Sequence, residues 1–169
     1  GYFGSSDAAH PLSALDSRYG VGRSSAYRWH EVDPRFDISR HPNEPHRFGW
    51  VVEIDPYDPS ATPKKRTALG RMKHDTAEVV VANDGRVVVY MGDDQVFEYI
   101  YKFDSEGRYD ARNPAANRDL LGRGTLYVAK FANGATNGDQ KGIGEWLPLV
   151  HGVTVRGTAF ASQADVLLN

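Results

Sequence analysis

The fold is decided by residues 77–103, which read AEVVVANDGRVVVYMGDDQVFEYIYKF. Two β-branched runs at 77–82 and 86–91 flank Asn-Asp-Gly at 83–85, and Asp-Gly between two such runs is a strong hairpin signal. Large apolar residues then alternate with polar ones along 97–103, which is the period of a strand with two different faces. We therefore predict three consecutive antiparallel strands. One face of the third strand should carry Phe97, Tyr99, Tyr101 and Phe103.

The strand pattern extends to both sides of this meander. Further strands are predicted at 48–54, 66–70, 125–131 and 145–150. A helix is predicted at 158–168, where apolar side chains recur at three- and four-residue spacing. That helix should bury Phe160, Ala164 and Leu167 or Leu168. Between the last two strands, the Gly- and Asn-rich stretch at 132–144 is long enough to be a candidate binding loop.

These elements predict a mainly β fold class: antiparallel meanders that form part of a β-propeller-like body, with a short C-terminal helix. The whole of 1–169 is expected to be a single segment of a larger domain. Within it, 1–40 is irregular and packed on the body, 41–157 carries the strands, and 158–168 is the helix. A complete propeller needs at least four blades of roughly 40–50 residues, and an irregular beginning leaves too little chain for that.

Composition describes an ordinary globular domain, with 40% hydrophobic and 25% charged residues. The formal net charge of −2 gives no electrostatic reason to expect a nucleic-acid partner. The longest apolar runs are too short to span a membrane, and residues 1–10 contain no signal-peptide pattern. No cysteine is present, which excludes thiol nucleophiles, zinc ribbons and disulfides. Because Gly1 is not an initiator methionine, we expect a processed or excised segment.

The densest group of polar residues is RHPNEPHR at 40–47, directly before a predicted strand. Proline fixes its own φ and restricts the residue before it, so Pro42 and Pro45 stiffen the Asn43-Glu44 dipeptide. Carboxylate and amide oxygens suit calcium or magnesium, and imidazole suits iron or zinc. Glu44 is therefore a candidate metal ligand on a stiff turn. The alternative is a solvated turn whose charges point outward.

Two further polar clusters flank the predicted hairpin. RMKHD occupies 71–75 before its first strand, and Gly-Asp-Asp occupies 92–94 after its second, so the hairpin should bring them to the same end. Asp75 and Asp93, together with a histidine, are then candidate ligands for a divalent ion, and Arg71 is a candidate clamp for an anionic substrate group. The alternatives are an Asp-capped turn and a surface ion pair. The usual phosphate-binding and nucleophile-elbow motifs are absent from the sequence.

Five stretches carry a family resemblance: HPNEPHRFGWVVEIDPYDPSATPKKRTALGR at 41–71, KHDTAEVVV at 73–81, VVVYMGDDQVFEYIYKF at 87–103, GTLYVAKF at 124–131 and FASQADVLL at 160–168. Together they resemble the PhoX-type alkaline phosphatases of bacteria. The resemblance covers most of the chain, and the first of the five stretches is both long and specific. Weaker similarity reaches back to GYFG at 1–4 and RYGV at 18–21.

The resemblance implies a multi-bladed β-propeller that hydrolyses phosphate monoesters with ferric iron and calcium and is exported to the periplasm by the twin-arginine route. It also implies that Glu44 matches the family's metal-ligating glutamate, and that His41 and Asn43 support the loop that carries it. Asp75 stands where relatives often have Glu, and His46 stands where Asn is common. The family's cysteine-containing metal motif and its Arg-Pro-Glu motif are expected upstream and downstream of this segment.

We therefore expect a segment of a metal-dependent phosphate-monoester hydrolase that contributes Glu44 to a centre completed elsewhere. The segment alone should be inactive, because a multi-metal site that lacks most of its ligands cannot hold its ions. The alternative is a non-catalytic propeller-type scaffold that binds calcium or a glycan through Asp93, Asp94 and the loop at 133–142, and a third possibility is a degenerate relative without metals. Exposed sheet edges should make the isolated segment self-associate. A Glu44 that is buried in an ion pair, or that points away from any shared cavity, would overturn its catalytic role.

Overall fold

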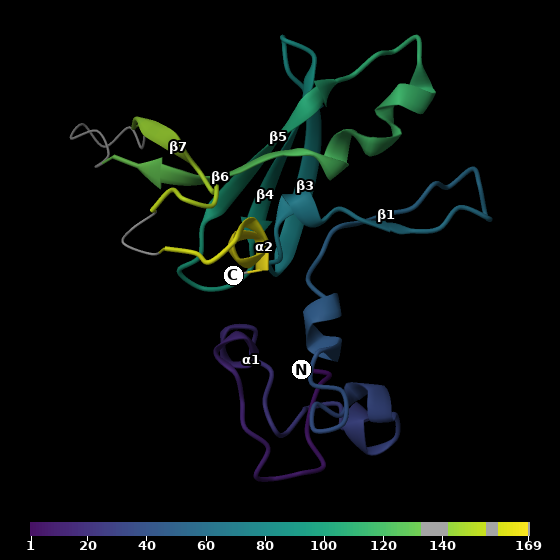
Figure 1. Ribbon diagram of the computed structural model, residues 1–169, viewed down its shortest axis with the longest axis vertical. Coiled ribbons are helices and arrows are strands. Elements are labelled where there is room, and N and C mark those ends of the chain that lie inside the picture. Colours follow the sequence, from purple (N-terminus) through teal and green to yellow (C-terminus); the bar gives the residue numbers. More distant parts are fainter. Residues whose placement is uncertain (133–141, 155–158, 169) are drawn as a thin grey trace. The chain divides into compact units, whose positions relative to one another are not determined.

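The computed structural model describes residues 1–132, 142–154 and 159–168. The chain divides into two compact units, Gly1–Gly49 and Trp50–Asn169 (Figure 1). The first unit is built from short helices and turns, whereas strands dominate the second. Each unit therefore has its own source of stability.

Short helices make up the first unit. The α-helix α1 spans Ala14–Arg18, and the 3₁₀ helices η1, η2 and η3 span Trp29–Glu31, Pro34–Phe36 and Glu44–Arg47. Helix α1 begins with a capping box in which Ser13 and Asp16 exchange side chain–backbone hydrogen bonds. The buried core of this unit consists of Phe3, Phe36 and Ile38, with Leu12 and Val21 packed against it. So small a core buries little apolar surface, so caps and turns add to the stability of the unit.

The second unit is a five-stranded sheet in which the strands follow one another in chain order and every neighbouring pair is antiparallel. Its strands are β3 (His74–Val81), β4 (Arg86–Asp93), β5 (Ile100–Arg108), β6 (Gly124–Phe131) and β7 (Gly144–Pro148). The other elements are the paired strands β1 (Val52–Glu53) and β2 (Lys64–Lys65), the 3₁₀ helices η4 (Thr67–Leu69) and η5 (Pro114–Gly122), and the helix α2 (Gln163–Leu168). The predicted antiparallel meander and C-terminal helix are thus confirmed.

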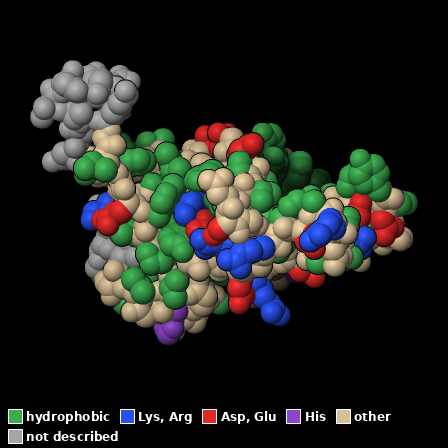
Figure 2. Space-filling view, turned by 90° about the horizontal axis from the view of Figure 1, so that it is seen from above, with side chains coloured by type: hydrophobic (Ala, Val, Ile, Leu, Met, Phe, Trp, Pro, Cys, Tyr) green, Lys and Arg blue, Asp and Glu red, His purple; other side chains and the backbone are tan. Residues whose placement is uncertain are grey.

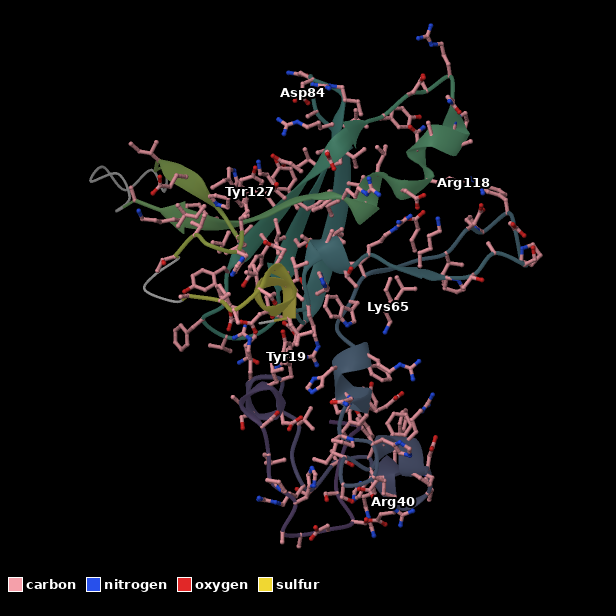
Figure 3. The ribbon with its side chains drawn as sticks, viewed as in Figure 1. Tyr19, Arg40, Lys65, Asp84, Arg118 and Tyr127 are labelled. Atoms are coloured by element: carbon pink, nitrogen blue, oxygen red, sulfur yellow. The ribbon has the colours of Figure 1, made fainter. Side chains whose placement is uncertain are left out.

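The hairpin predicted at Asn-Asp-Gly is also confirmed. Strands β3 and β4 pair with Val79 opposite Val89. Gly85 adopts a φ of 85°, a left-handed conformation that glycine reaches without a steric cost. Asp84, at the tip of the hairpin, accepts hydrogen bonds from the backbone N–H of Arg86 at 3.1 Å and from its Nε at 2.7 Å (Figure 3). Local turn chemistry therefore sets the register of the first two strands.

One face of the sheet carries the core of the second unit. Val89, Phe103 and Leu126 lie side by side across β4, β5 and β6, and all three are almost completely buried. Burial of each such side chain contributes about 1.5–3 kcal/mol, so this row is a main source of the unit's stability. The other buried residues of the core are Leu69, Met72, Met91, Tyr101 and Val128.

Two strand predictions are wrong in detail. The strand predicted at 66–70 is the 3₁₀ helix η4, and the strand that pairs with β1 lies earlier, at β2. Phe97 does not share a strand face with Phe103: it lies before β5, has a left-handed φ of 67° and is 97% exposed. A turn is the cause, because the Glu98 N–H donates to the Gln95 carbonyl at 3.1 Å and delays the start of the strand.

The C-terminal helix is shorter than predicted. The Oγ of Ser162 accepts a hydrogen bond from the Asp165 N–H at 3.1 Å, as an N-terminal cap does, so α2 begins at the next residue. The starting point at 158 lies outside the described residues. The residue that α2 buries is Val166, and Ala164 is exposed instead. Leu167, one of the residues predicted to face the core, does pack against it while remaining partly exposed.

Surface properties agree with the composition. On the face drawn in Figure 2, Lys and Arg side chains are interspersed with Asp, Glu and hydrophobic side chains. No helix among the described residues combines the length and the apolar character that crossing a membrane requires. The predicted binding loop cannot be compared with the sheet, since its residues 133–141 lie outside the described part of the chain.

Candidate functional site

Glu44 is the first residue of η3, on the turn that the sequence marks as a metal-ligand candidate. The turn is closed by its backbone, because the Glu44 N–H donates to the His41 carbonyl at 3.1 Å. Asn43 forms the N-terminal cap position, and Pro45 follows in the first turn, where its missing N–H has no intrahelical partner to lose. His41 and Asn43 are both exposed. The backbone therefore fixes the point from which the Glu44 side chain extends.

The Glu44 carboxylate forms an ion pair with Arg47. The Nη1 atom of Arg47 lies 3.1 Å from Oε1 and 3.0 Å from Oε2 of Glu44. The Glu44 side chain is 13% exposed and that of Arg47 is 67% exposed, so the cation lies on the solvent side of the pair. This pairing counts against a carboxylate that stands ready for a metal, since an ion would have to replace the guanidinium. Glu44 itself is only partly buried, so the pair remains in contact with solvent.

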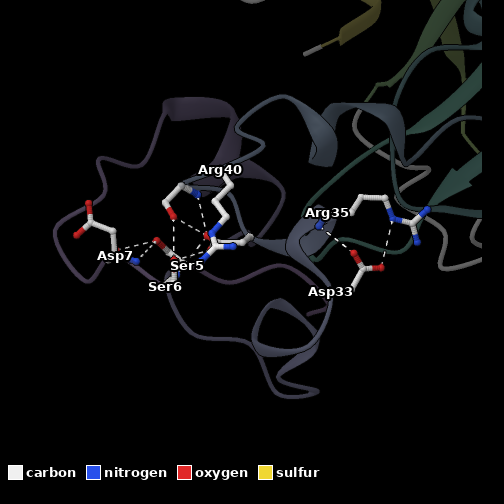
Figure 4. Close-up of polar contacts among 8 residues, drawn as sticks. Ser5, Ser6, Asp7, Asp33, Arg35 and Arg40 are labelled. Carbon is white, nitrogen blue, oxygen red and sulfur yellow. Dashed lines mark hydrogen bonds and ion pairs between the residues drawn. The ribbon is translucent and has the colours of Figure 1, made fainter.

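A second carboxylate, Asp37, anchors the chain that enters this turn, and two of its partners, Ser6 and Arg40, are labelled in Figure 4. It is buried, and its oxygens accept hydrogen bonds from the backbone and hydroxyl groups of Ser6 and Ser39. Burial acts to raise the pKa of Asp37, but the hydrogen bonds from Ser39 and Ser6 outweigh it and hold the pKa well below its usual range. The sequence analysis missed Asp37. The signal that could have found it is the Asp-x-Ser spacing, which favours a local side-chain hydrogen bond.

The two polar clusters that flank the hairpin do meet at one end of it, as predicted. His74 lies opposite Asp93 in the β3–β4 register, and the Asp94 N–H donates to the Lys73 carbonyl at 2.9 Å. Asp93 uses Oδ1 to accept the Gln95 N–H at 2.9 Å, which is the Asp-stabilised turn foreseen as the alternative. The antiparallel ladder thus places a histidine beside a carboxylate.

His74 is a partly buried titratable group at this hairpin end. Its Nε2 lies 3.2 Å from the Gly70 carbonyl, and its buried Nδ1 has no hydrogen-bond partner among the described residues. Burial lowers the pKa of His74, while the Gly70 carbonyl and the charge of Asp93 act in the opposite direction. A neutral imidazole with one open nitrogen is the form that binds metal ions.

The other two candidates at this end lie in contrasting environments. Asp75 falls where the β3–β4 pairing skips from His74 to Thr76, and it is exposed. Arg71 is 5% exposed, and its backbone N–H donates to the Leu167 carbonyl at 2.7 Å. A substrate clamp has to reach its anion, so the role predicted for Arg71 requires an opening that this buried position does not itself provide.

The fit of these residues to a metal ion is partial. Among the described residues there is no group of three or more His, Asp or Glu side chains that could hold one. Glu44 offers a hard oxygen donor, which suits calcium, but a calcium ion takes six to eight oxygen ligands. Glu44 belongs to the first unit, whereas His74, Asp75 and Asp93 belong to the second. The described residues therefore bring together no complete metal site around Glu44.

Comparison with known proteins gives a consistent result. The family model for alkaline phosphatase PhoX matches residues 1–169. A solved structure, Pseudomonas fluorescens PhoX in complex with vanadate, a transition state analogue, is 51% identical in sequence with a TM-score of 0.91. The match covers 99% of this chain and 30% of that one, so the chain spans less than a third of its relative. A search of curated proteins found no match. The likeness confirms the predicted fold class, a β segment of a propeller-like body.

Proposed function

This chain belongs to the PhoX alkaline phosphatase family, and we propose that it forms part of an enzyme that hydrolyses phosphate monoesters. The proposal is supported by the match over the whole chain and by the relative that binds vanadate, a transition state analogue. Because the chain corresponds to 30% of that relative, most of the catalytic apparatus would come from other parts of the protein. A periplasmic location of the whole protein is part of the proposal, and fractionation of cells would test it.

Glu44 is the residue that we propose this chain supplies to a metal centre containing calcium and iron. The observation that carries this proposal is its position on a backbone-closed turn, inside the stretch that most specifically resembles the family. When bound, metal ions neutralise phosphate charge and polarise the phosphorus for attack. This chain would hold the Glu44 carboxylate at a fixed place, and Arg47 would pair with that carboxylate until a metal ion binds it. His41 and Asn43 would orient the turn; Asp75, Asp93 and Arg71 remain weaker candidates for metal and phosphate binding.

The proposed ligand is tested in the whole protein with Glu44→Gln. This variant keeps the size of the side chain and removes its charge, so we expect loss of bound iron or calcium by elemental analysis and loss of p-nitrophenyl phosphate hydrolysis. Glu31→Gln is the matched control, because Glu31 also pairs with an arginine three residues away, Arg28, at 2.7 Å on an exposed surface. A Glu44→Gln protein with full metal content and full activity would contradict the proposal.

The 169-residue chain by itself is expected to have little or no phosphatase activity. One carboxylate cannot retain a multi-metal centre, and the described residues add no cluster that could. The measurement is hydrolysis of p-nitrophenyl phosphate by the purified chain with added calcium and iron. Robust turnover would show that the chain contains a complete site and would refute this interpretation.

We also propose that the isolated chain self-associates through β3. This strand ends the sheet order and pairs only with β4 among the described strands. Val79, Val80 and Val81 on it are 40–52% exposed, so the open edge is also apolar. Light scattering should show species larger than a monomer, and Val80→Lys should reduce them because an inserted charge disfavours edge pairing. A monodisperse monomer of the unaltered chain would exclude the proposal.

A further inference from the structure

The Asp37 carboxylate of the first unit is buried and accepts several hydrogen bonds. It is 1% exposed, and Oδ1 accepts the Ser39 Oγ–H at 2.6 Å, the Ser39 N–H at 3.0 Å and the Ser6 N–H at 3.2 Å. Oδ2 accepts the Ser6 Oγ–H at 2.5 Å and lies 3.2 Å from Nε of Arg40. Burying an ion is costly unless its lone pairs are filled, and here donors from two separate segments fill them.

The same residue joins the beginning of the chain to the approach of the Glu44 turn. Gly4 and Asp37 form a parallel bridge, in which the Gly4 N–H donates to the Phe36 carbonyl at 3.1 Å and the Ile38 N–H donates to Gly4 at 2.9 Å. The backbone N–H and the hydroxyl group of Ser6 both donate to the Asp37 carboxylate, and these hydrogen bonds hold the bridge in place. The carboxylate is therefore the point at which two chain segments, 31 residues apart, are fastened together.

Two successive sets of backbone hydrogen bonds connect Asp37 to Glu44. The Asp37 carbonyl accepts the Arg40 N–H at 3.1 Å and the His41 N–H at 2.8 Å. The His41 carbonyl in turn accepts the Glu44 N–H at 3.1 Å. A rotation of Asp37 would consequently change the direction in which the turn leaves the unit. The affinity of a site for its ion depends on the position of each ligand to within less than an ångström. Such a rotation would therefore displace the Glu44 carboxylate and weaken binding of the ion.

We propose that Asp37 is a positioning residue for Glu44: its buried carboxylate fixes the path of the chain from Ser6 and Ser39 through His41 to the Glu44 turn. This inference rests on the proposed role of Glu44 as a metal ligand. Asp37 itself touches no ion or substrate in this role. Its negative charge is required because four of its five contacts are donated N–H or O–H hydrogen bonds and the fifth is a guanidinium, a set that an amide cannot accept in full.

The test is Asp37→Asn, made both in the 169-residue chain and in the whole protein. In the chain, hydrogen exchange at the amides of His41 and Glu44 should become at least about 10-fold faster, because both donate within the turn. In the whole protein, equilibrium dialysis should show calcium affinity reduced by roughly 10-fold or more, as expected when support of a ligand is removed. The matched control is Asp33→Asn: Asp33 accepts the Arg35 N–H at 2.9 Å in the same unit but is exposed, so neither quantity should change.

The outcomes separate the two claims. If Glu44→Gln abolishes metal binding while Asp37→Asn changes neither exchange nor affinity, the inference is wrong and the proposed function stands. If Glu44→Gln leaves the metals in place, the proposed role of Glu44 as a metal ligand fails; exchange in the chain then still decides whether Asp37 holds the turn. Should Asp37→Asn prevent folding, Ser39→Ala removes one hydroxyl donor and leaves the carboxylate. Unchanged exchange at His41 in that milder variant would overturn the inference, and faster exchange would support it.

Discussion

The guanidinium of Arg66 donates from Nε to the Glu53 carboxylate at 2.7 Å, although the Arg66 side chain is only 5% exposed. Its terminal nitrogens reach the Arg118 carbonyl and, at 3.4 Å, the Asp119 carboxylate. The hydrogen bond to Glu53 is the main cause that raises the Arg66 pKa above its usual value. One buried cation thereby joins β1 to η5, two elements that lie far apart in the sequence.

Arg66→Met should lower the free energy of unfolding by about 1–3 kcal/mol, because the Arg118 carbonyl loses a donor and two carboxylates lose their cation. Urea unfolding of the purified chain measures the change. Lys64→Met is the control, since Lys64 also pairs with Asp119, at 2.9 Å, but on an exposed surface. Its effect should stay below about 1 kcal/mol. Equal losses for the two variants would show that burial of Arg66 adds nothing.

Gly124→Ala should destabilise the sheet. A Cβ at Gly124 would lie 2.2 Å from the Asp104 carbonyl oxygen and 2.5 Å from Cζ of Phe103, so backbone or core has to move. Overpacking of this kind costs about 1–3 kcal/mol. Gly92→Ala in β4 is the control, because its Cβ would meet only the Thr76 hydroxyl at 4.0 Å. Thermal unfolding that is equally lowered in both variants would contradict the steric explanation.

Phe103→Ala should cost about 3–5 kcal/mol, the usual loss when a buried aromatic side chain is removed. Phe103 is 0% exposed in the central strand β5, so the core residues around it would lose packing contacts that solvent cannot replace. Phe97→Ala makes the same chemical change at a side chain that is 97% exposed, and it should alter stability by less than about 0.5 kcal/mol. Denaturant midpoints of the two variants compare them directly. A large loss for Phe97→Ala would mean that the side chain has contacts within the isolated chain.

His74 predicts a pH dependence of stability. Burial lowers its pKa in the folded state, so the unfolded state takes up a proton first as the pH falls through about 6.5. The stabilisation that the neutral imidazole provides is therefore fully present above that pH. It is lost progressively as the pH falls toward the folded-state pKa of His74. His74→Gln removes the titration, so the unfolding free energy of the variant should fall less than that of the original chain between pH 7.5 and 5.5. Parallel pH profiles for the two proteins would rule out His74 as the source.

Much of the second unit could be predicted from local sequence. The hairpin depends on Gly85 and on β-branched neighbours, which act within a few residues, so strand identity and register follow from the pattern. Phe97 was misplaced for the opposite reason. Its alternation with Tyr99 is that of a strand, yet hydrogen bonds in the preceding turn decide where pairing begins.

The candidate site was only partly predictable. The convergence of His74 and Asp93 follows from the hairpin itself and is confirmed. The pairing of Glu44 with Arg47 lies within reach of a sequence argument, since residues three apart on a helical turn face each other. The burial of Asp37 against Ser6 does not, because the contact bridges 31 positions.

The sequence by itself determined the hairpin, most of the strands and the family, since these depend on residue periodicity, turn chemistry and long matching motifs. Only the tertiary structure decided which charges are buried and what satisfies them. Asp37 and Arg66 look like surface residues in one dimension, and both become buried because donors or acceptors from distant segments replace their water. Desolvation depends on every neighbour in space, and no local window of sequence contains that information.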